Sequence, residues 1–107
     1  MSWSRGPNLF AHPAAPPHGE HFEELARLGP TRIERIVSSA QPDPDLYDQP
    51  QDEWVVLLRG EARLELAGTE ISLTAGDTLL IPSHTPHRVL MTSAGALWLA
   101  VHTSPIA

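Results

Sequence analysis

Residues 76–89 decide the fold, and they read Gly76-Asp-Thr-Leu-Leu-Ile-Pro82-Ser-His84-Thr-Pro86-His87-Arg-Val89. A Gly-Asp turn leads into a short apolar strand that stops at Pro82, and a second strand begins at His87 after a polar corner. Because successive strand residues point to opposite faces, His87, Val89 and Met91 are expected to share one face. The pattern predicts a histidine at the mouth of a barrel, heading an inward-facing apolar row.

The rest of the chain alternates short strands with turns in the same way. Strands are expected at 31–38, 54–58, 62–66, 70–74, 86–92 and 96–102, with Gly, Pro and Asp in the turns. The run Trp54-Val-Val-Leu-Leu58 is apolar on both faces, which predicts a strand buried on both sides. About seven short strands at this spacing predict an all-β sandwich or barrel.

The N-terminal part, residues 1–30, is expected to lie outside a barrel formed by residues 31–107. Residues 1–17 hold four prolines and one apolar pair, Leu9-Phe10, and are expected to form an arm docked on its own barrel or on a neighbour's.

Residues 19–28 predict a short amphipathic helix. Phe22, Leu25 and Leu28 recur three apart, acidic residues come early, and Gly29-Pro30 follows as a stop signal.

Composition excludes several classes of function. The net charge of the 107 residues is −6, and all seven basic residues are arginines that form no cluster. Such a chain is a poor binder of nucleic acid or of anionic membranes, because both need a basic patch. The sequence has no cysteine, which excludes disulfides and thiolate chemistry, and no long apolar window. These features predict a cytoplasmic protein, and the Arg-only, Ala- and Pro-rich composition suggests a bacterial source.

The opening stretch resembles a motif of the single-domain cupins, which are small jelly-roll β-barrels. That motif is a glycine, five residues, a proline, four residues and a metal-binding histidine, and Gly76, Pro82 and His87 fit it. His84 stands where a second glycine is usual. The resemblance covers about residues 31–103 and implies an all-β cupin barrel, preceded here by one short N-terminal helix.

The other cupin motif is matched only in its second half. Glu53 and Gly60 have the expected spacing of six intervening residues, but Tyr47 and Gln49 stand where the family usually has a His-x-His pair. Metal-binding cupins present three histidines and one glutamate to a divalent metal such as Fe, Mn, Ni or Zn. The resemblance therefore implies a reduced site at Glu53 and His87 with Gln49 as a weak oxygen ligand, or Asp48 if the loop shifts register.

Glu53 and His87 are also the candidate catalytic pair. Glu53 precedes an apolar run and shares a face with Val55 and Leu57, so its carboxylate needs a partner if it is buried. If both faces look into the lumen, Glu53 and His87 meet there. The alternatives are an exposed glutamate at the start of a strand and a buried histidine bonded to Glu53 or Tyr47.

Five residues are candidates for substrate binding, namely Tyr47, Gln49, His84, Trp98 and His102. Loop packing is the alternative for Tyr47 and Gln49. For His84 the position favours the surface at the rim, and for His102 a core or edge role is weighed against a place in the lumen.

Three functions remain open from the sequence. The first is a barrel that binds a small molecule with a divalent metal, which could act as a Lewis acid. The second is a metal-free enzyme in which Glu53 and His87 exchange protons with the substrate. The third is a non-catalytic sensing or storage barrel. The resemblance also implies a homodimer, with Leu9-Phe10 and strand 31–38 as interface.

Overall fold

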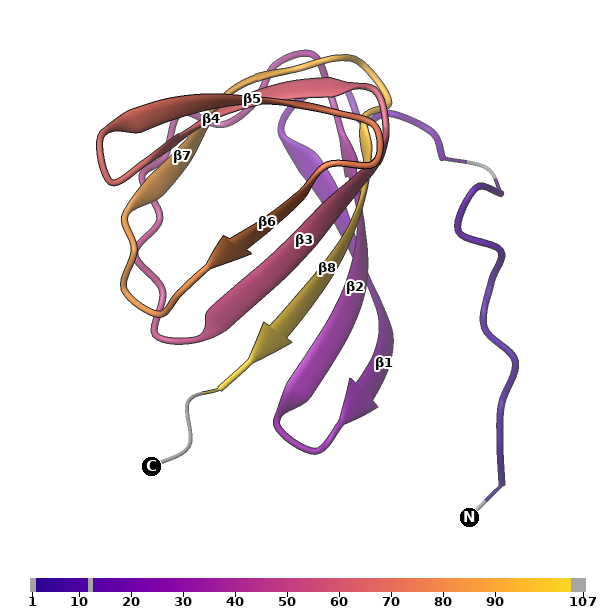
Figure 1. Ribbon diagram of the computed structural model, residues 1–107. Coiled ribbons are helices and arrows are strands. Elements are labelled where there is room, and N and C mark those ends of the chain that lie inside the picture. The colour runs from indigo at the N-terminus through magenta and orange to yellow at the C-terminus, as the bar shows by residue number, and fades with distance from the viewer. Residues whose placement is uncertain (1, 12, 105–107) are drawn as a thin grey trace.

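Eight β-strands in two sheets form the folded part of the chain (Figure 1). The computed structural model describes residues 2–11 and 13–104. The strands are β1 Glu20–Leu28, β2 Thr31–Ser38, β3 Asp52–Arg59, β4 Glu61–Leu66, β5 Thr69–Thr74, β6 Thr78–Ile81, β7 His87–Thr92 and β8 Leu97–Thr103. The larger sheet has the order β1-β2-β8-β3-β6 and the smaller sheet the order β5-β4-β7. The all-β prediction is confirmed.

The predicted N-terminal helix is wrong, because residues 20–28 form strand β1. This strand pairs antiparallel with β2 from Glu20 opposite Ser38 to Leu28 opposite Thr31, with one bulge between. An isolated helix of this length is marginal in water, so pairing with an available strand decides the conformation. Gly29 has φ +59° and makes a two-residue hairpin turn with Pro30.

Within the part of the chain that the structure describes, no helix has the length and apolarity that crossing a bilayer requires.

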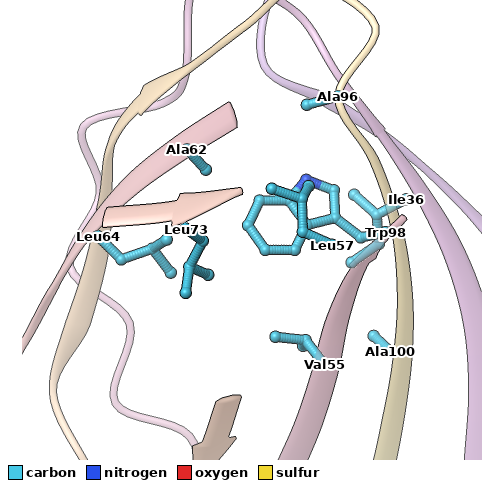
Figure 2. Close-up of a cluster of buried hydrophobic side chains, with 9 residues drawn as sticks. All are labelled: Ile36, Val55, Leu57, Ala62, Leu64, Leu73, Ala96, Trp98 and Ala100. Carbon is cyan, nitrogen blue, oxygen red and sulfur yellow. The ribbon is translucent and has the colours of Figure 1, made fainter. Parts of the chain in front are cut away.

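The core lies between the two sheets, and both sheets contribute to it (Figure 2). The buried apolar side chains are Ile36, Val55, Leu57, Ala62, Leu64, Leu73, Ala96, Trp98 and Ala100. Leu57 and Trp98 are directly opposite each other in the β3–β8 ladder, and Leu57 is fully buried. They lie on the inward face of their strands, where inward and outward side chains alternate along the chain.

Strand β3 is not buried on both sides as predicted. Glu53, Val55 and Leu57 point into the core, whereas Trp54 on the opposite face is 40% exposed. Trp54 lies opposite Leu80 of β6, which is 63% exposed. The outer face of the larger sheet therefore carries a pair of large exposed apolar side chains.

A bulge in β7 changes the row behind His87. His87 pairs with Leu66 and Val89 with Leu64, but the next pair of the ladder is Met91 with Arg63. Leu90 is the extra residue, so the alternation shifts and Met91 joins the face of Arg63. The predicted row of His87, Val89 and Met91 is therefore broken after Val89.

The two motif glycines are required by backbone conformation. Gly60 and Gly76 have φ +93° and +95°, a region that residues with a Cβ atom rarely adopt. At Gly60 a Cβ would also lie 2.5 Å from the hydroxyl oxygen of Ser93. These glycines turn the chain between the sheets and so position the strands that carry Glu53 and His87.

The N-terminal arm packs against the outer face of the larger sheet of its own chain. The Arg35 guanidinium donates hydrogen bonds to the carbonyl oxygens of Asn8, Leu9 and Ala11 and pairs with Glu23. The guanidinium of Arg59 lies 5.3 Å from the centre of the Phe10 ring.

Candidate functional site

A cavity of about 110 Å³ opens between the two sheets beside the apolar core. One water needs about 10–15 Å³ by the same measure, so the space suits a small organic molecule. Its polar walls are Glu20, Glu34, Tyr47, Gln49, Glu53, His87 and His102, and its apolar walls are Phe22, Ile36, Val55, Leu64, Ile81, Val89 and Trp98. A mostly apolar cavity with a few convergent polar groups is typical of a ligand site.

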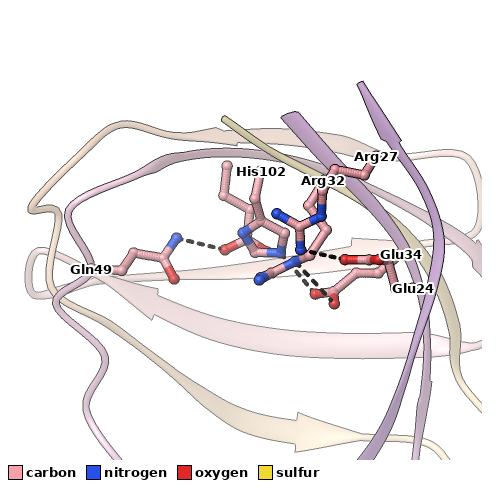
Figure 3. Close-up of polar contacts among 7 residues, drawn as sticks. Glu24, Arg27, Arg32, Glu34, Gln49 and His102 are labelled. Carbon is pink, nitrogen blue, oxygen red and sulfur yellow. Dashed lines mark hydrogen bonds and ion pairs between the residues drawn. The ribbon is translucent and has the colours of Figure 1, made fainter. Parts of the chain in front are cut away.

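His102 lies between the buried carboxylates of Glu34 and Glu53 on the larger sheet, and Figure 3 shows it with Glu34 and Gln49. Its Nε2 lies 2.8 Å from Glu34 Oε1 and 3.8 Å from Glu53 Oε2. The sheet register explains this contact, because Glu53 pairs directly with His102 while Glu34 pairs with Ala100, two residues earlier on the same face. His102 is buried against Glu34 as a core histidine would be and also lines the cavity, and ligand binding by His102 stays a prediction.

His87 enters the cavity from the smaller sheet and is 6% exposed. Its Nδ1 lies 2.9 Å from the carbonyl oxygen of Thr85, and its ring stacks on Tyr47 with centroids 5.7 Å apart. The backbones of Tyr47 and His87 also form a β-bridge. Burial first, and then nearby carboxylates led by Glu20, raise the pKa of the Tyr47 phenol, so its hydroxyl keeps its proton as a donor.

Glu53 does not meet His87 directly. The Gln49 amide nitrogen donates a 2.9 Å hydrogen bond to Glu53 Oε1, and the other carboxylate oxygen faces His102. Neither a hydrogen bond nor an ion pair joins Glu53 to His87, although both are described residues and both line the cavity.

The predicted metal ligands Glu53, His87 and Gln49 all line the cavity. Gln49 donates an N–H group to Glu53, so a metal contact from Gln49 would have to come from its amide oxygen. Among the described residues, no three His, Asp or Glu side chains come together as a metal-binding group.

The other predicted residues divide between the cavity and the surface. Trp98 lines the cavity, and its indole N–H donates to the hydroxyl of Ser38 at 3.0 Å. His84 is outside, with a side chain 67% exposed and paired with Asp48 at 2.9 Å. This exposure agrees with the surface position expected for His84, and His84 is not among the residues that line the cavity. Substrate binding by His84 stays a prediction.

Glu20 and Glu34 are site residues that the sequence reasoning did not identify. Glu34 lies in an alternating row with Ile36 on a β-branched strand, and a carboxylate in an apolar row is the signal that had singled out Glu53. Glu20 carried no such signal, since it lies in the segment expected to be a helix. It reaches the lumen only because β1 pairs with β2.

The Glu20 carboxyl lies in surroundings that disfavour its charge. Burial raises the pKa of Glu20, a 2.5 Å hydrogen bond from the Ser38 hydroxyl opposes this effect, and the carboxylates of Glu53, Asp43 and Glu34 add to it. The carboxyl groups of Glu20, Glu34 and Glu53 thus share the wall of one cavity.

Glu20→Gln is expected to be more stable than the wild type at pH 8, with the difference disappearing in acid. Because the folded-state pKa is raised above the ordinary value of 4.5, the fold favours the protonated carboxyl. That contribution is complete below the unfolded-state pKa and is lost as the pH rises through the folded-state value. Urea unfolding at pH 4 and pH 8 measures this, with the exposed Glu61→Gln as control. Equal stability of Glu20→Gln and wild type at pH 8 would contradict it.

Comparisons with known proteins agree with the fold. The family model of the Cupin domain matches residues 36–102, and no curated protein matches the chain. A solved structure described as a putative mannose-6-phosphate isomerase from Ralstonia eutropha JMP134 is 38% identical, with a TM-score of 0.85, over 95% of this chain and 100% of its own.

Two further structures share the fold at lower identity. An RmlC-like cupin from Desulfovibrio desulfuricans is 20% identical, with a TM-score of 0.76, over 97% of this chain and 100% of its own. An RmlC-like cupin from Shewanella frigidimarina NCIMB 400 is 17% identical, with a TM-score of 0.73, over 81% and 78%. With the family match over more than half its length, this chain belongs to the cupin family as a single-domain cupin.

Proposed function

We propose that this cupin binds a small molecule in its lumen and exchanges protons with it through Glu53 and the two histidines. The cavity carries this proposal, because it brings Glu53, His87 and His102 to one space with each less than 10% exposed. Acid–base catalysis needs groups of this kind within hydrogen-bond reach of a substrate and shielded from water.

The remaining wall residues have supporting roles in the proposal. Glu34 orients the His102 ring through its 2.8 Å contact with Nε2. Gln49 orients Glu53, the Tyr47 hydroxyl donates to the ligand, and Trp98 packs against the ligand's apolar part.

The name of the Ralstonia protein suggests isomerisation of a sugar phosphate, a reaction that includes proton transfer. We carry over only the proton transfer, because no arginine or lysine is among the described residues that line the cavity. A phosphate group is usually held by such cations or by backbone amides.

Cupins often bind metals, and a divalent metal at Glu53 and His87 stays a prediction. The test of ligand binding is therefore designed to be independent of it. Untagged protein is treated with EDTA, its metal content is measured by elemental analysis, and binding is then measured on the treated sample.

At least one compound from a panel of small polyols, keto acids and amines is expected to raise the melting temperature of the treated protein. Saturation at about 100 times Kd adds about 2.7 kcal/mol, or about 10 °C for a domain of this size. Val89→Phe narrows the cavity and should abolish the shift, whereas Leu80→Phe on the outer face should keep it. A shift retained in Val89→Phe, or no shift with any compound, would contradict the proposal. A compound that raises the melting temperature but is not converted to a product would favour a sensing role.

We also propose a homodimer through the outer face of the larger sheet. Trp54 and Leu80 lie side by side there, 40% and 63% exposed, and Ile33 of strand 31–38 belongs to the same face. Exposed aromatic and aliphatic side chains of this kind are typical of the centre of an interface. Leu9-Phe10 packs on the same outer face, at Arg35.

Sedimentation is expected to show a dimer for the wild type and a monomer for the double variant Trp54→Asp/Leu80→Asp. Burying two unpaired carboxylates in an interface is strongly unfavourable. Leu46→Asp is the control, because Leu46 is 55% exposed in a loop away from this face. A wild type that stays monomeric at high concentration would reject the dimer, and a double variant that stays dimeric would reject this interface.

A further inference from the structure

The lumen carries an excess of negative charge. The carboxylates of Glu20, Glu34 and Glu53 lie in its wall, and no positively charged arginine or lysine side chain lines it within the described residues. Arg32 lies behind the wall, with its Nε 3.7 Å from Glu34. A ligand placed in this cavity meets a negative potential that water screens little, because the cavity is largely apolar.

Each of the two histidines presents one ring nitrogen to a hydrogen-bond acceptor of the protein. His87 Nδ1 faces the carbonyl oxygen of Thr85, and His102 Nε2 faces Glu34 and Glu53. Because these partners only accept hydrogen bonds, the facing nitrogens carry the hydrogens, and in the neutral rings His87 Nε2 and His102 Nδ1 are acceptors.

His102 provides an observation that is independent of the carboxylates. Its side chain is 9% exposed, and its Nδ1 is buried without a hydrogen-bond partner. Buried polar atoms in folded proteins are nearly always paired, and this nitrogen has no partner among the described protein atoms.

The cavity wall offers few hydrogen-bond donors for these hydrogen-bond acceptors. The Gln49 amide donates one N–H to Glu53, and its second N–H and the Tyr47 hydroxyl are further donors among the wall residues. A fitting ligand therefore brings its own N–H donors and a positive charge, which is the chemistry of an ammonium group. Phe22 and Trp98 offer apolar and aromatic surface for a small hydrocarbon body and for cation–π contact.

We propose that the lumen selects a small organic amine, bound as its ammonium ion, and rejects phosphorylated or carboxylated compounds of the same size. This inference rests on the proposed function, because it names the substrate class of the same cavity. The proposed amine also differs in chemical class from the sugar phosphate that the name of the Ralstonia protein suggests.

Calorimetric titration of EDTA-treated protein with isobutylammonium chloride, isobutanol and sodium isobutyrate tests the inference. The three compounds share a branched hydrocarbon body and differ in charge. The ammonium ion is expected to bind at least about tenfold more tightly than the alcohol, and the carboxylate is expected not to bind. Val89→Phe should lose binding of the amine and the alcohol together.

Replacing single glutamates of the cavity wall by glutamine tests whether their charges attract the amine. Glu53→Gln and Glu20→Gln should each weaken amine binding about tenfold or more and leave alcohol binding within about threefold, whereas Glu61→Gln on the exposed strand β4 should match the wild type. Using two lumen variants keeps the test valid if one of them folds poorly.

The outcomes distinguish the two proposals. Alcohol or carboxylate binding as tight as amine binding, or amine binding unchanged in both lumen variants, overturns the inference and leaves the proposed function standing. Zinc chloride binding to the wild type without any amine binding also overturns it, in favour of a metal. If no compound of this or the wider panel binds, both proposals fall.

Discussion

Trp98→Ala is expected to lower the free energy of unfolding by about 3–5 kcal/mol, the range measured for removal of large aromatic side chains from cores. Trp98 is 4% exposed and packs at the centre of the buried cluster between the sheets (Figure 2). Its removal leaves a large void next to the existing cavity. It also takes the indole N–H donor from the buried hydroxyl of Ser38. Urea unfolding monitored by circular dichroism measures the change.

Trp54→Ala is the matched control for this substitution. It removes the same side chain from the neighbouring strand β3, but Trp54 is 40% exposed on the outer face of the sheet. Its loss should cost about 1 kcal/mol or less under conditions that keep the protein monomeric. Equal losses for Trp98→Ala and Trp54→Ala would mean that the interior does not lie between the two sheets as described.

His102→Ala is expected to cost about 3 kcal/mol of stability and to abolish ligand binding in the lumen. The substitution leaves Glu34, whose side chain is 8% exposed, without its hydrogen-bond donor from His102, and Glu53 loses the imidazole nitrogen that lies 3.8 Å from its carboxylate. Removing the imidazole is destabilising because the buried Glu34 carboxylate then keeps only the Arg32 guanidinium, whose Nε lies 3.7 Å away, as a charged partner. Urea unfolding at pH 7 gives the stability, and the compound panel gives the binding.

Two further variants make the His102 result specific. His84→Ala removes an imidazole that is 67% exposed and paired with Asp48, so its cost should stay within about 0.5 kcal/mol. In the double variant His102→Ala/Glu34→Ala the buried carboxylate is gone, and the loss should be smaller than the sum of the single losses. Strict additivity would show that Glu34 and His102 are not coupled.

Strand pattern and motif spacing predicted much of the architecture. The alternation in residues 62–66 and 70–74 placed two strands of the smaller sheet, since one face of each strand must be apolar to be buried. The spacing of Gly76, Pro82 and His87 predicted the family, which is confirmed. The buried positions of Glu53 and His87 in one cavity agree with the prediction, and their chemical roles stay proposals.

The helix over residues 19–28 shows where local pattern failed. Phe22, Leu25 and Leu28 are compatible with a helical period of three to four, but the same residues also fit an edge strand that is mostly exposed. Nothing local separates the two, because a short helix gains too little from its own hydrogen bonds. Pairing with β2 decides the strand conformation of these residues, and the same pairing places Glu20 in the wall of the lumen.

By itself the sequence determined which residues are apolar, where the turns must fall and which faces of the strands are available for burial. These properties depend on neighbours along the chain, so an all-β barrel follows from them. The convergence of Glu20, Glu34, Glu53, His87 and His102 was decided only by the tertiary structure. Strand pairing and bulges set which side chains face one another across a sheet, and a shift of one residue in register sends a side chain to the other face.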